Sequence, residues 1–183
     1  YVADRRMVAD GNVVTTTGIT AAMPMMLALI DAIAGSEKAE AVARDLGVGN
    51  WDLRHVSGAF QLTRSFATSV LSNRMAFWNR DSWGIELEAG MDEVSLAIIA
   101  DAWSRTYRSN AVTFVQAQSA IATANGVRVL PDRVEEGWPE ERVASTFPDQ
   151  RPADALDQTL EAITDRYGEA TTNVVAMQLE YTR

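Results

Sequence analysis

The chain has 183 residues, of which 47% are hydrophobic and 22% charged, a balance typical of a globular protein with a sizeable core. Its formal net charge of -9 argues against nucleic acid or an anionic membrane as a partner, because those surfaces need clustered lysines and arginines. The absence of cysteine and the presence of one histidine exclude disulfides, a cysteine nucleophile and a multi-histidine metal site within this chain, and nothing in it indicates a cofactor.

The first predicted elements are two short strands around a tight turn. Residues 6–8 and 12–16 flank the dipeptide Asp10-Gly11, which favours a hairpin because both positions tolerate positive φ. Gly18 then allows a sharp turn, and Thr20 is a candidate N-cap for the helix that follows.

Two helices should come next. Pro24 falls in the first turn of the first helix, where its missing N–H costs no hydrogen bond, and Gly35 ends that helix. Ser36 is placed to cap a second helix over residues 36–46. A connection carrying the lone histidine, His55, separates it from a longer helix expected over residues 58–78. The apolar face of that longer helix would comprise Ala59, Leu62, Phe66, Val70 and Phe77.

The second half of the chain alternates strands with helices. Residues 83–90 have the period of a half-buried strand, and residues 92–107 have that of a helix, with Asp92-Glu93 favoured at its N-terminus by the helix dipole. Strands are predicted at residues 111–115 and 126–130. We expect Trp78, Trp83 and Trp103 to be core or interface residues.

The last third contains a loop and two more helical segments. Residues 131–152 hold four of the five prolines, which favours a linker or surface loop. A helix is expected over residues 153–167. Residues 171–181 fit either a strand or a helix, and the capping position of Thr171 favours the helix. Strands interleaved with helices indicate an α/β layer architecture.

The first part of the chain resembles a known family. The stretch VVTTTGITAAMPMMLALIDAIAGSEKAEAVARDLGV, residues 13–48, is similar to the closing segment of the ThiJ/PfpI family, the class I glutamine-amidotransferase-like proteins. The matching positions are Thr15, Gly18, Thr20, Ala21, Leu27, Leu29, Gly35, Ala39 and Val42. A fainter resemblance to the opening of the same module runs over residues 91–132. The resemblance implies an incomplete flavodoxin-like α/β module in residues 1–48, followed by a helix-rich α/β extension in residues 49–183 that is a candidate degenerate second module.

In active members of that family, a cysteine on a strand-to-helix elbow is assisted by an early acidic residue and often a histidine. This chain has no cysteine, so the resemblance assigns no catalytic residue to it. The expected role is scaffold and part of a small-molecule pocket edge, with any hydrolase-, lyase- or amidotransferase-like chemistry dependent on an upstream nucleophile. The abrupt start at Tyr1 predicts an exposed apolar edge, covered by an upstream polypeptide of the same gene product or by a second copy of the chain in a homo-oligomer. A cytoplasmic location is expected.

Candidate ligand-binding residues are Thr16, Thr17, Gly18 and Thr20, in the turn after the second predicted strand. Ligands of open α/β sheets bind where parallel strands end, and a glycine there permits close approach. The alternative is that Gly18 only makes the turn and Thr20 only caps a helix. His55 is expected to be structural or exposed rather than a general base, because no acidic partner is identifiable near it. Two further functions stay open: a ligand-sensing or transcription-regulator-like module, and a structural or interaction protein.

Overall fold

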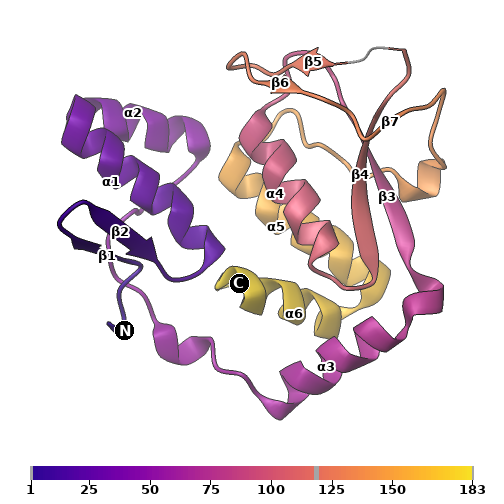
Figure 1. Ribbon diagram of the computed structural model, residues 1–183, viewed down its shortest axis with the longest axis horizontal. Coiled ribbons are helices and arrows are strands. Elements are labelled where there is room, and N and C mark those ends of the chain that lie inside the picture. The colour runs from indigo at the N-terminus through magenta and orange to yellow at the C-terminus, as the bar shows by residue number, and fades with distance from the viewer. Residues whose placement is uncertain (1, 118–119, 183) are drawn as a thin grey trace.

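The structure, a computed structural model, describes residues 2–117 and 120–182 (Figure 1). The helices in chain order are α1 (Ala22–Ala34), α2 (Ser36–Leu46), α3 (Arg64–Met75), α4 (Glu93–Ser104), α5 (Pro152–Tyr167) and α6 (Glu169–Leu179). The strands are β1 (Met7–Asp10), β2 (Val13–Thr16), β3 (Asp81–Glu86), β4 (Ser109–Val115), β5 (Ile121–Ala122), β6 (Arg128–Val129) and β7 (Arg133–Val134). No helix in the described ranges is both long and apolar enough to cross a membrane.

A parallel sheet forms the centre of the second half. Its strand order is β3-β4-β7, with Asp81 opposite Ser109 and Phe114 opposite Arg133. On the other side of β3, Gly84 forms a parallel bridge with Val143. Helix α4 is the crossover between β3 and β4, as parallel pairing requires. The predicted α/β class is therefore confirmed, with its parallel sheet in residues 81–134.

The core lies between this sheet and helices α4, α5 and α6. From β3, alternate residues Trp83 and Ile85 are buried, and the indole of Trp83 stacks on that of Trp103 in α4 with ring centroids 4.0 Å apart. The opposite side of β3 is also covered, because Trp138 lies over Gly84 and stacks on Phe114. A Cβ at position 84 would come within 2.6 Å of the Trp138 ring, so only glycine fits there.

The N-terminal hairpin is separate from that sheet. Strands β1 and β2 pair antiparallel with each other alone, and helices α1 and α2 lie beside them (Figure 1). Gly11, at the turn, has a φ of 58°, which confirms the predicted hairpin. The assumption that the second strand ends at the edge of an open parallel sheet is wrong. The exposed side chains of Val13 and Val14 explain the difference, because a strand inside such a sheet would bury them.

The helix predicted over residues 58–78 is shorter in the structure. The α-helix covers residues 64–75, with separate 3-10 turns at residues 57–59 and 77–79, and Leu62 and Phe77 of the predicted apolar face are exposed. The buried residue of α3 is polar: Asn73 donates hydrogen bonds to the Thr106 carbonyl and to Thr171 Oγ1. The packing of α3 therefore depends on a polar contact with residues that are distant in the sequence, and the spacing of apolar residues cannot reveal such a contact. Trp78 is also exposed, whereas Trp83 and Trp103 are in the core as predicted.

Residues 131–152 are mostly an exposed loop, as the surface-loop prediction had it, but they also contribute to the sheet. They contain β7, and the Ala144 N–H donates to the Gly84 carbonyl at 2.9 Å. Strand β7 has two residues, too few for an alternation of apolar and polar residues to be recognised in the sequence.

Three predicted helix caps are wrong, namely Thr20, Ser36 and Thr171, and Thr171 lies inside α6, whose N-cap is Gly168. Helix α1 begins at Ala22 with no side-chain cap, because the Thr20 hydroxyl is bound elsewhere. The Ser36 hydroxyl donates to Asp31 instead of capping α2. The acidic pair Asp92-Glu93 lies at the N-terminus of α4 as expected, and there Asp92 accepts from the Ser95 N–H at 2.7 Å. The last segment is the helix α6, as the prediction favoured.

Candidate functional site

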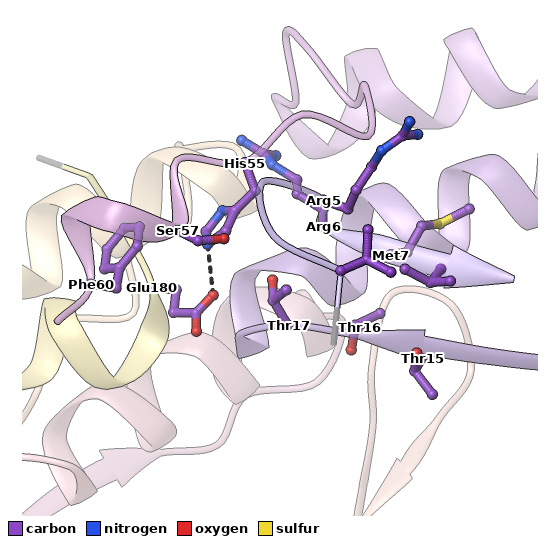
Figure 2. Close-up of a pocket in the computed structure, with 12 residues that line it drawn as sticks. Arg5, Arg6, Met7, Thr15, Thr16, Thr17, His55, Ser57, Phe60 and Glu180 are labelled. Carbon is purple, nitrogen blue, oxygen red and sulfur yellow. Dashed lines mark ion pairs between the residues drawn. The ribbon is translucent and has the colours of Figure 1, made fainter. Parts of the chain in front are cut away.

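A cavity of about 260 Å³ lies beside the N-terminal hairpin, where the end of α6 meets the connection between α2 and α3 (Figure 2). Its walls come from three parts of the chain that are far apart in sequence. They are formed by Val2, Arg5, Arg6, Met7, Val8, Thr15, Thr16, Thr17, His55, Ser57, Phe60 and Glu180. Two of the candidate residues, Thr16 and Thr17, are among them.

His55 and Glu180 form the polar centre of this cavity. His55 Nε2 lies 2.9 Å from Glu180 Oε2, and the histidine side chain is only 8% exposed. The imidazole stacks on Phe60 with centroids 5.3 Å apart and planes 5° from parallel. Figure 2 shows the pair joined by a dashed line, with Phe60 beside the imidazole. The prediction that His55 is merely structural or exposed did not anticipate this acidic partner.

Two buried oxygen atoms at the cavity have no hydrogen-bond partner among the described residues. They are Thr17 Oγ1 and Glu180 Oε2. Although Glu180 Oε2 is close to the imidazole, it accepts no aligned hydrogen bond from it. Buried polar atoms of this kind cost free energy unless something pairs with them. The Thr17 hydroxyl is therefore the polar group of this cavity without a partner in the described part of the chain, whereas Glu180 Oε2 faces the imidazole of His55.

Glu180 is held in position by the turn that contains the other candidate residues. The Thr20 hydroxyl contacts the carbonyls of Leu179 at 2.9 Å and Glu180 at 3.1 Å. Glu180 itself has a φ of 53°, an uncommon value for a residue other than glycine. The turn therefore fixes the end of α6 and directs the carboxylate into the cavity.

Gly18 has a steric role that the sequence did not reveal. Its φ of -81° is ordinary, so it is not needed for backbone freedom. A Cβ there would lie 2.5 Å from Glu180 Cβ and 2.6 Å from Cγ. Gly18 thus permits the close approach of a side chain of this protein, and it does not line the cavity.

The Gly18→Ala variant is expected to lose about 1–3 kcal/mol of unfolding free energy, because the added methyl overpacks the contact with Glu180. Chemical denaturation measures the loss. Gly49→Ala is the matched control, since nothing lies within 4 Å of a Cβ at that position. Equal stability of the two variants would contradict the close packing described above.

A second cavity, of about 300 Å³, shares Arg6, His55, Phe60 and Glu180 with the first. The His55–Glu180 pair therefore stands between two adjoining spaces. Tyr181 lines the second one, and its hydroxyl donates to Asp157 at 2.8 Å. Burial and the neighbouring Asp157 raise the pKa of Tyr181 to about 12, so this hydroxyl keeps its proton at neutral pH.

The cavity contains no activated nucleophile. The Ser57 hydroxyl accepts from the Asp4 N–H at 3.0 Å, and the Ser57 N–H donates to the Asp4 carboxylate. Ser57 is thus part of a local turn contact, and no described hydrogen bond joins it to His55. No group of three or more acidic or histidine side chains within residues 2–117 and 120–182 is arranged to hold a metal ion.

A smaller cavity, of about 230 Å³, lies beyond the carboxyl end of β3, lined by Glu88, Met91, Ser95 and Phe147 among others. The Ser95 hydroxyl is buried there without a hydrogen-bond partner in the described part of the chain. The hydroxyl-bearing residues of its wall are Ser95, at the start of α4, and Thr146, and the wall has no histidine. Its polar groups are fewer than those around His55.

No protein-family model matches this chain, and no curated protein matches it. Among solved structures, it is similar to oxidized DJ-1 from Toxoplasma gondii, with 11% sequence identity and a TM-score of 0.44. That likeness covers 56% of this chain and 99% of the DJ-1 chain. It is a partial likeness of fold, and the function of this chain has to be argued from its own residues.

Proposed function

We propose that the chain is part of a ThiJ/PfpI-like protein and forms a pocket wall that binds a small polar molecule beside His55 and Glu180. The observation that carries the proposal is that the His55–Glu180 ion pair and the buried Thr17 hydroxyl, which has no partner among the described residues, lie on the walls of one cavity. The resemblance of residues 13–48 to the closing segment of that family gives the placement.

For this chain on its own, ligand binding is better supported than catalysis. There is no cysteine, and the hydroxyl of Ser57 is already paired with Asp4. Hydrolase-, lyase- or amidotransferase-like chemistry would therefore need a nucleophile from another polypeptide. A sensor-like role is the second candidate, because the cavity lies at the contact between the N-terminal hairpin and the end of α6. A ligand there would change how firmly these two parts are joined.

The single histidine offers a direct test with acetamide as the probe, because this small neutral molecule both donates and accepts hydrogen bonds. Saturable movement of the His55 imidazole resonances in an NMR titration at constant pH and ionic strength is the expected result. Thr17→Val should weaken acetamide binding about threefold to tenfold, because one neutral hydrogen bond contributes roughly 0.5–1.5 kcal/mol. The fold should be unaffected, since Thr17 Oγ1 has no partner among the described residues to lose.

Thr68→Val on α3 is the matched control, since that hydroxyl bonds only to the Ser65 carbonyl in the described structure and lies outside the cavity wall. Movement of the His55 signals that does not saturate, or that is the same in both threonine variants, would argue against a binding pocket. It would instead favour a structural or interaction role.

A further inference from the structure

Exposed apolar side chains gather on α3 and directly after it, at one edge of the molecule (Figure 1). Leu71 and Met75 are each more than half exposed, and because they are four residues apart they lie on one face of the helix. Beyond the end of the helix, the rings of Phe77 and Trp78 meet edge to face with centroids 5.0 Å apart, and both rings are mostly exposed. Large exposed apolar surfaces of this kind commonly mark an interaction site.

The opposite face of α3 attaches the helix to the rest of the molecule. Asn73, two positions after Leu71 and therefore on the other side, is the buried residue of α3, and its amide bonds to Thr106 and Thr171. A helix that only covers the core of its own chain has apolar residues inward and polar residues outward. In α3 the buried side chain is polar, and Leu71 and Met75 face outward, so the outer face is suited to contact with another molecule.

The charge near this face is positive. Residues 53–80 contain four arginines and no aspartate or glutamate, although the whole chain has a net charge of -9. Arg64, at the start of α3, lies two turns before Leu71 on the same face, and it forms no ion pair within the described residues. An exposed indole, that of Trp78, lies past the other end of the helix. The two groups suit each other, because a guanidinium is attracted to the face of an indole ring.

The outer face of α3 is complementary to itself around Leu71. Ala67 and Met75 lie four residues before and after it. When two copies of α3 pack antiparallel around a two-fold axis at Leu71, the large Met75 of one copy meets the small Ala67 of the other. The same arrangement brings Arg64 of one copy to the helix end beyond which Trp78 of the other lies. The two Arg64 residues are then about 20 Å apart, beyond the screening length of about 8 Å at physiological ionic strength.

We propose that two copies of the chain associate through α3 as a symmetric, antiparallel dimer with Leu71 at its axis. The exposed parts of Phe77 and Trp78 amount to on the order of 200–350 Å² in each copy. With Leu71 and Met75 included, the two copies bury on the order of 1,000 Å², the lower limit for a specific interface. The dimer is therefore expected to dissociate in the micromolar range. It does not involve the cavity beside His55.

Sedimentation equilibrium at a series of protein concentrations tests the association. The weight-average mass should rise from that of one chain toward twice that value as the concentration increases. Leu71→Arg should keep the chain monomeric, because it places two guanidinium groups opposite each other at the axis. Ile33→Arg is the matched control, since Ile33 is also an exposed aliphatic residue of a helix, and this variant should dimerise like the unmodified chain. Far-UV circular dichroism shows that both variants are folded.

Introduced cysteines test the direction of the helices, because the chain has no cysteine of its own. Under mild oxidation, Leu71→Cys should form a disulfide-linked dimer, whereas Arg64→Cys and the control Ile33→Cys should not. Efficient cross-linking of Arg64→Cys would show a parallel pair and overturn the proposal. A mass that stays at that of one chain, or unchanged dimerisation of Leu71→Arg, would overturn it as well and leave this face to a partner of another kind.

Discussion

The Trp103→Ala variant is expected to lose about 3–5 kcal/mol of unfolding free energy, the cost of removing a large buried aromatic side chain. Trp103 is 2% exposed, stacks on Trp83 and meets the edge of Tyr167 with centroids 6.1 Å apart. The substitution leaves a cavity between β3 and α4, and it also removes the aromatic pairing. Denaturation by guanidinium chloride, followed by far-UV circular dichroism, measures the change.

Trp78→Ala is the matched control for that experiment, because the same residue type is 75% exposed at position 78. Its expected effect is within about 0.5 kcal/mol. Similar losses in the two variants would show that Trp103 does not have the central packing role assigned to it.

The second large effect concerns Asp81, a buried carboxylate at the start of β3. Its Oδ2 accepts from the Tyr167 hydroxyl at 2.7 Å and from Arg166 at 2.9 Å. Asp81→Asn should cost about 1.5–3 kcal/mol at neutral pH, the usual contribution of a hydrogen bond to a charged group. Arg166 would then lose its anionic partner.

The same variant gives a pH dependence with a definite sign. Burial alone would raise the pKa of Asp81, but the hydrogen bonds from Tyr167 and Arg166 and the charges of Arg166 and Arg142 outweigh it and hold the pKa below its ordinary value. A lowered folded-state pKa stabilises the fold above the unfolded-state value, about 3.9, and that contribution is lost as pH falls through the folded-state pKa.

The stability difference between the unmodified chain and Asp81→Asn should therefore be largest near neutral pH and shrink below about pH 4. Asp52→Asn, at an exposed carboxylate paired with Arg54, serves as the control and should change stability little at any pH. A difference that stays constant down to strongly acidic pH would show that the charge of Asp81 is not what stabilises the fold.

The sequence predicted elements whose signals are local. The hairpin at Gly11, the end of α1 at Gly35 and the start of α4 at Asp92 each depend on one residue with a strong backbone or capping preference. In residues 83–90 and 92–107 the apolar residues recur with the periods of a strand and of a helix, because one face of each element is buried. The length of helix α3 was overestimated, because its packing depends on Asn73, whose hydrogen-bond partners lie 33 and 98 residues away in the sequence.

The candidate site was predictable only in part. Thr16 and Thr17 were identified from the turn after a strand, and both line the cavity. Their partners could not be found, because His55 and Glu180 are 125 positions apart and neither belongs to a recognisable motif. Only the fold brings them together. The role of Gly18 depends equally on a contact with the other end of the chain.

The bond from the Thr20 hydroxyl to Glu180 spans 160 residues and so closes a loop that includes most of the chain. Closing so long a loop costs more entropy than the pairing of β3 with β4, whose facing residues Asp81 and Ser109 are near in sequence. The sheet can therefore assemble before the ends of the chain meet, and it can survive after they separate. The cavity beside His55 and Glu180 would then be the last part to form and the first to be lost. A molecule bound in this cavity would hold the two ends of the chain together. Its effect on stability would appear mainly as a slower separation of these ends.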